Sequence, residues 1–135
     1  MKRRFTTRAQ SDAFDTVLDV GLALPNVQAV TKYDGSPALK VGGAFMAGVA
    51  THRSAEPATI VVRVDLVERE WLLQEAPDIY YLTDYYRPHP VVLVRLTRID
   101  RDALRDLLSG SWRLTLRKAR KPASTTQKKV STIIV

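Results

Sequence analysis

The residues best suited to chemistry with a charged partner lie at the carboxyl end of the chain. Residues 111–135 contain seven lysines and arginines and no acidic residue, whereas residues 1–110 contain 14 of each kind. The formal net charge of +7 therefore comes entirely from the last part of the sequence. A local block of cations indicates an anionic partner more strongly than a diffuse excess does.

Two conformations of this basic block both separate its cations from its apolar residues. In a helix, Arg113 and Arg117 lie four residues apart, and Arg120 and Lys121 continue the same face. In an extended segment, Arg113, Thr115 and Arg117 point one way, opposite Trp112, Leu114 and Leu116. Either arrangement predicts phosphate contacts, and a solvated surface is the alternative. The predicted nucleic-acid-binding residues are Arg113, Arg117, Lys118, Arg120 and Lys121.

Other candidate groups give weaker signals. Asp12, Asp15 and Asp19 share one face of a predicted helix, and carboxylates suit hard cations, but a solvated helix face is the more ordinary interpretation. The two histidines, His52 and His89, belong to no zinc or nucleophile motif. We therefore expect no catalytic residue, no metal site, no cofactor and no small-molecule ligand.

The tyrosines have two interpretations. Tyr80, Tyr81, Tyr85 and Tyr86 could stack on unpaired bases. Aromatic residues in a strand are more often core residues or cross-strand pairs, and residues 79–86 are predicted to be a strand or an ordered loop.

The elements that would position these residues follow from apolar spacing and from capping and turn signals. Helices are predicted over residues 12–24, ending at Pro25, over residues 66–76 behind Asp65, and after Asp100, with Gly110 ending or kinking the last one. Strands are predicted over residues 27–33, 38–41, 44–51, 58–64 and 91–96, with turns at residues 34–35 and 42–43. This order predicts an α+β fold, a single antiparallel sheet with helices packed on one face. The predicted core includes Phe14, Leu18, Val62, Trp71, Leu93, Leu104 and Leu108.

Length and composition favour one globular domain. The 135 residues are 45% hydrophobic and 26% charged, and they include no cysteine, which excludes disulfides and thiolate metal sites. No signal peptide and no apolar run of membrane-spanning length is present, so we expect a cytoplasmic protein without membrane contact. We expect a basic arm over residues 1–10, a domain over 11–121 and a polar tail over 122–135. The strand-like end of the tail, Val130 to Val135, is either unstructured or adds to a sheet edge, its own or a partner's.

Three blocks of the sequence are similar to the MmcQ/YjbR-like family. They are Leu24-Pro25 with Tyr33 to Val41, then Asp84 to Leu96, then Ile99 to Trp112. The resemblance covers about residues 11–121 and implies a CyaY/frataxin-like fold, in a family often labelled as double-wing DNA-binding proteins. Frataxin-like proteins bind iron on an acidic first helix, which the face of Asp12, Asp15 and Asp19 resembles, although a solvated helix face is the interpretation preferred here. The sequence departs from the family pattern at Ser36 and Leu39, and residues 51–56 are not rich in lysine as a wing would be.

The basic block and the resemblance together predict a nucleic-acid-binding protein, electrostatic and weakly sequence-specific, with DNA as the expected partner. The alternative is a protein–protein interaction module that uses the open sheet or the C-terminal strand, including self-association, without catalysis.

Overall fold

One antiparallel sheet and three helices make up the described part of the chain. The computed structural model describes residues 8–120, with side chains described for residues 14–119. In chain order the elements are α1 (Arg8–Leu22), β1 (Val27–Thr31), β2 (Pro37–Val41), β3 (Ala44–Val49), β4 (Thr59–Arg63), α2 (Leu66–Glu75), β5 (Tyr80–Tyr81), β6 (Val91–Arg95) and α3 (Arg101–Arg120).

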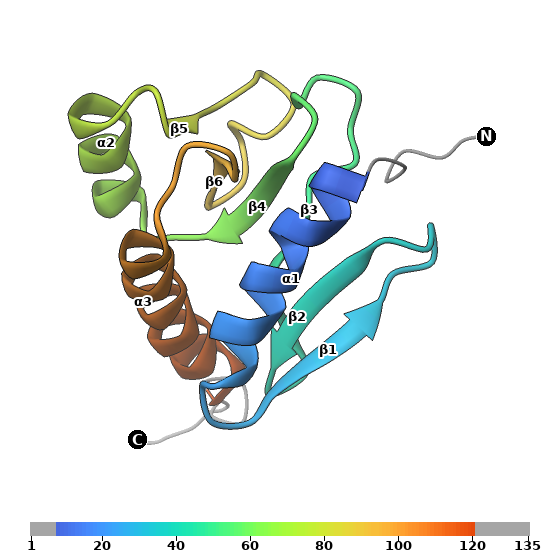
Figure 1. Cartoon of the computed structure of the whole chain (residues 1–135). Helices are drawn as coiled ribbons and strands as arrows, with labels where there is room; N and C mark the ends of the chain where they lie inside the picture. The colour runs from blue at the N-terminus through green and yellow to red at the C-terminus, as the bar shows by residue number, and fades with distance from the viewer. Residues whose placement is uncertain (1–7, 121–135) are drawn as a thin grey trace, which may run out of the picture.

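The strands lie in the order β1-β2-β3-β4-β6-β5, and every neighbouring pair is antiparallel. Figure 1 shows α1 and α3 side by side across one face of the sheet, with α2 beside the β5–β6 end. The predicted α+β class with helices on one face is therefore confirmed. Within residues 8–120, no helix combines the length and apolar character needed to cross a bilayer.

Capping residues set the starts of two helices where the sequence predicts them. The Asp65 carboxylate accepts hydrogen bonds from the backbone N–H groups of Val67 (3.0 Å) and Glu68 (3.3 Å). The Asp100 carboxylate accepts one from Ala103 N–H (2.8 Å). Each bond satisfies a donor that the first turn of a helix leaves without a partner. The last helix does not end at Gly110 but continues to Arg120.

The β1–β2 turn explains one departure from the family pattern. Gly35 has φ +88°, the left-handed conformation that favours glycine. The Asp34 carboxylate accepts hydrogen bonds from the Ser36 hydroxyl (2.6 Å) and from Ser36 N–H (3.0 Å). These bonds lower the pKa of Asp34 below its usual value. Ser36 is buried, so its hydroxyl closes the turn from inside.

The main core lies between the helices and the sheet. Phe14, Val62, Leu104 and Leu108 are buried in it, and the half-buried Leu18 packs against it. Leu93 is also buried, but it belongs to a smaller cluster with Val61, Tyr86 and Val91. Neighbouring residues of β4 and β6 enter the main core, so alternation places this second cluster on the opposite face of the sheet.

The prediction that Trp71 belongs to the core is wrong, because its side chain is 60% exposed. α2 carries apolar residues on two sides. Leu72, Leu73 and Ala76 pack against the core, whereas Val67 and Trp71, four residues apart, point to solvent. Apolar content alone therefore does not identify the buried side of this helix.

Arg69 occupies the centre of the buried side of α2. It is 8% exposed, and its Nη1 donates to the carbonyl oxygens of Arg87 (3.3 Å), His89 (2.7 Å) and Val91 (3.2 Å). A buried polar group is costly unless it is hydrogen-bonded, and here one cation satisfies three backbone acceptors. Arg69 therefore fixes the segment that leads into β6 against α2.

Replacing Arg69 by Met should destabilise the fold by about 1–3 kcal/mol, because three carbonyls lose a charged donor while the apolar volume is kept. Urea denaturation measures the free energy of unfolding. The matched control is Arg98→Met at an exposed position, expected within about 0.5 kcal/mol of the unmodified chain. Equal stability of the two variants would contradict this role.

Two helical glycines provide a test of the packing between α1 and the sheet. A Cβ at Gly21 would overlap Cδ1 of Leu39, which is fully buried, whereas a Cβ at Gly110 would meet nothing closer than 3.9 Å. Gly110→Ala should stabilise the protein by about 0.5–1 kcal/mol through helix propensity. Gly21→Ala should instead destabilise it by about 1–3 kcal/mol through overpacking. Thermal and urea unfolding of both variants would check this, and a similar gain at both positions would refute the tight approach.

Candidate nucleic-acid interface

The carboxyl-terminal half of α3 is held on the sheet by its inner side. Ser111 and Thr115 are buried, and the Ser111 hydroxyl donates to the Met46 carbonyl (3.3 Å) in β3. The Trp112 indole N–H donates to the Pro25 carbonyl (2.9 Å), which ties α3 to the loop after α1. These contacts fix the rotation of α3 about its own axis, so the opposite side of this half of the helix faces away from the sheet.

The outer side of the same half carries exposed cations. Arg113, Arg117 and Lys118 are all exposed, and the first two lie one helical turn apart. The helical alternative for this block is thus correct, and the extended one is wrong. Arg120 ends α3, but its side chain, Lys121, residues 1–7 and the predicted tail lie outside the described residues.

The end of α3 meets the β2–β3 turn. Gly42 has φ +60°, and a Cβ there would stand 2.9 Å from the Ala119 Cβ. Lys40, two residues before Gly42, adds a half-buried cation to this end of the sheet. The β2–β3 turn and the basic half of α3 therefore lie next to each other and form one contiguous surface at this end of the molecule.

The charges along α3 divide into two groups. In the amino-terminal half, Arg101 pairs with Asp19 of α1, and Arg105 pairs with Asp102 (3.1 Å). In the other half, Arg117 and Lys118 make no ion pair with any residue that the structure describes. Cations here also complement the partial negative charge of the helix carboxyl terminus.

Glu68 of α2 marks the boundary between these halves. Burial raises the pKa of its carboxyl group, and the nearby Asp65 charge raises it further. Arg113 opposes both effects and lowers the pKa, so the field of Arg113 reaches this carboxylate. Arg113 is therefore partly compensated, whereas Arg117 and Lys118 are not.

The acidic face of α1 does not assemble a metal site in the described part of the chain. Asp19 pairs with Arg101, Asp15 is exposed, and the side chain of Asp12 lies outside the described residues. No group of three or more histidine, aspartate or glutamate side chains suitable for a metal ion occurs among the described residues.

The four tyrosines have separate roles. Tyr80 and Tyr86 are buried, and the hydroxyl of Tyr81 accepts from Glu56 N–H (2.8 Å). Tyr85 is 52% exposed, and one face of its ring stacks on His52 with centroids 3.5 Å apart. Sequence spacing could not predict that Tyr85 stacks on His52, because the two residues lie 33 positions apart in the chain.

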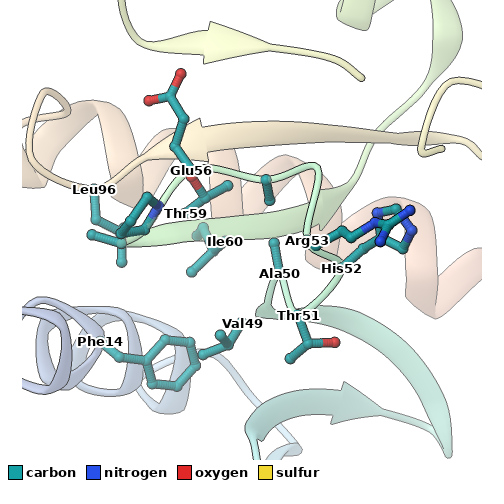
Figure 2. A pocket seen from close by; sticks show the side chains of 13 residues that line it. Phe14, Val49, Ala50, Thr51, His52, Arg53, Glu56, Thr59, Ile60 and Leu96 are labelled. Carbon is teal, nitrogen blue, oxygen red and sulfur yellow. The ribbon is translucent and has the colours of Figure 1, made fainter. Parts of the chain in front are cut away.

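A small cavity of about 190 Å³ opens between α1 and the β3–β4 loop. Figure 2 shows Phe14 reaching toward Val49, while the Glu56 carboxylate points away. Glu56 pairs with Arg95 (2.7 Å), whose hydrogen bonds lower the pKa of the carboxyl group.

A histidine and a serine stand beside this cavity. His52 Nδ1 lies 2.9 Å from Ser54 Oγ and accepts from Ser54 N–H, so the pair belongs to a local turn. Ser54 Oγ also forms a hydrogen bond with Thr83 Oγ1 (2.9 Å). Neither contact supplies the carboxylate that orients a catalytic histidine, and the basic half of α3 is therefore the stronger candidate site.

Comparison with known proteins shows which family this chain resembles in fold and in sequence. A search of the curated proteins gave no match. The crystal structure of DR2400 from Deinococcus radiodurans, which carries a DUF419 domain, is similar with a TM-score of 0.64 and 25% identity, over 82% of this chain and 83% of that chain. The family model YjbR matches residues 22–114, more than half of the sequence and all the strands described above. The chain therefore belongs to the YjbR family.

Proposed function

We propose that the protein binds nucleic acid through the basic carboxyl-terminal half of α3, without catalysis. The observation that carries the proposal is the exposure of Arg113, Arg117 and Lys118 on one rigid helix, the last two without a carboxylate partner among the described residues. Arg120 and Lys121 extend the same basic run in the sequence. Such a row supplies phosphate contacts and releases condensed counterions.

The proposed binding is weakly sequence-specific, with DNA as the expected partner. Phosphate contacts position a protein on nucleic acid but carry no base identity. The inner side of α3 is occupied by the sheet, which leaves one side of the helix for the partner. We also propose a cytoplasmic location, where a chain without cysteine suits the reducing conditions.

A second candidate function uses the edge of β1 that pairs with no strand among residues 8–120. This strand ends the sheet order, and Gln28, Ala29 and Thr31 are exposed along it. An exposed edge offers backbone groups to an added strand, from another protein or from a second copy. Binding of this kind would be insensitive to the charges of α3.

The dependence of affinity on salt tests the main proposal. Each phosphate contact lowers the slope of log K against log salt by about 0.9 for duplex DNA, so Arg117→Ala should make the slope shallower by about one. Because phosphates are shared by all sequences, the loss should be similar for unrelated probes. Fluorescence anisotropy with short duplex and single-stranded probes at about 50–200 mM salt provides the measurement.

The matched control is Arg105→Ala, which removes the same charge from the same helix where Asp102 already compensates it. It should leave the slope unchanged. No binding at the lowest salt would exclude nucleic acid. Equal effects of the two substitutions would show that the contact with nucleic acid is not made by the carboxyl-terminal half of α3.

Glu68 gives a pH-dependent test of the same electrostatics. Its pKa is raised in the folded protein, so the ionised form costs stability, and this cost grows as pH rises through the folded pKa. Glu68→Gln should therefore be more stable than the unmodified chain at neutral pH. The difference should shrink below the unfolded pKa of about 4.3, where the carboxyl is neutral in both states.

The same substitution removes the carboxylate that compensates Arg113, and DNA affinity at neutral pH should rise modestly. Thermal unfolding from about pH 3.5 to 8 and anisotropy at neutral pH check the two effects separately. A stability difference that is constant across this range would contradict the assignment to the Glu68 carboxyl.

A further inference from the structure

A second surface, distinct from the basic half of α3, lies between α2 and the amino-terminal half of α3. It is a groove of about 360 Å³. Leu72, Ile79, Tyr80 and Leu107 supply apolar surface, and Trp71 stands at the side. Figure 1 shows these two helices on the same side of the molecule, next to β5. The groove is therefore open to a segment from outside the described fold.

The charged side chains that line the groove are all acidic. Glu68, Glu75 and Asp106 line it, and no lysine or arginine does. Arg69, the arginine within α2, points inward to backbone carbonyls. Arg105, next to Asp106, is paired with Asp102. An occupant that combines cations with apolar side chains would therefore match this surface.

Three large apolar side chains of α2 are exposed, and one of them, Trp71, lines the groove. Val67 is 79% exposed, Leu66 54% and Trp71 60%. Adjacent apolar residues left in water on one helix mark an interaction surface more often than isolated ones do. This exposure is independent of the acidic cluster, and both features point to the same kind of ligand.

We propose that residues 128–135 of this chain, Lys-Lys-Val-Ser-Thr-Ile-Ile-Val, occupy the groove. Lys128 and Lys129 face the carboxylates, and the following β-branched residues cover Trp71 and its apolar neighbours. No other stretch of the sequence after α3 combines adjacent cations with an apolar run. The segment carries no acidic side chain that would repel Glu68, Glu75 or Asp106.

The length of the chain permits this contact within one molecule. α3 ends at Arg120, and Leu107 lies about 20 Å back along the helix at 1.5 Å per residue. The seven residues 121–127 span up to about 23–25 Å when extended. A tether that can span this distance raises the local concentration of the segment, which in dilute solution favours the chain's own segment over that of a second copy.

Disulfide trapping tests the proposal directly, since the chain has no cysteine of its own. Ser131→Cys is combined with Ala103→Cys, which lines the groove, or with Ala29→Cys on the exposed edge of β1. Both changes replace an alanine by a cysteine, so the two pairs differ only in where the second cysteine lies. Oxidation of dilute full-length protein, followed by mass spectrometry, should give the 103–131 bond within one molecule at least about tenfold faster than the 29–131 bond.

Charge variants distinguish specific docking from random collision. Lys128→Glu with Lys129→Glu, or Glu75→Lys with Asp106→Lys, should slow the 103–131 bond by about fivefold or more. Asp84→Lys, an exposed acid outside the groove, should leave its rate unchanged. Equal rates for the two cysteine pairs would overturn the proposal. A faster 29–131 bond would assign the segment to the β1 edge, and a disulfide between two molecules would assign it to a second copy, and either result also overturns it.

Discussion

The burial of one side of α3 along the sheet constrains the rest of the molecule. Leu104, Leu107 and Leu108 fill the core at one end, and the small polar Ser111 and Thr115 continue the buried side at the other. Once this side is fixed, every remaining residue of the helix must face α1, α2 or solvent. The position of the cations, the boundary at Glu68 and the groove beside α2 all follow from this one packing arrangement.

Local signals in the sequence predicted most of the elements, but α1 begins at Arg8, within the predicted basic arm of residues 1–10. Asp65 and Asp100 bond the first turns of α2 and α3, and Asp34-Gly35 forms the turn between β1 and β2, because caps and tight turns depend on residues a few positions apart. Gly110 shows the limit of such signals. Its weak helix propensity is outweighed by the packing of residues on both sides of it, so α3 continues.

The features that the sequence could not predict depend on tertiary contacts. Arg69 is buried because three carbonyls near the start of β6 accept its hydrogen bonds, and backbone acceptors leave no trace in a sequence pattern. Trp71 is exposed because Arg69, Leu72 and Ala76 occupy the inward side of α2. The helical spacing of Arg113 and Arg117 was predictable as one alternative. That Glu68 partly compensates Arg113, while Arg117 has no ion-pair partner among the described residues, depends on how α2 packs beside α3.

The two halves of α3 differ in charge, because two arginines balance two aspartates in residues 101–110 whereas residues 111–120 carry cations and no acidic residue. Asp102 and Asp106 lie toward its amino terminus together with Arg101 and Arg105. Arg113, Arg117 and Lys118 lie toward its carboxyl terminus, where the helix dipole favours cations. This arrangement of charges stabilises the helix even when all of the charged side chains are solvated. This order does not account for the exposed apolar side chains of Trp71 and Val67 on α2, because these side chains take no part in charge interactions. The two surfaces proposed above therefore call for different ligands: a segment with cations and apolar side chains for the acidic groove between α2 and α3, and an anion for the carboxyl-terminal half of α3.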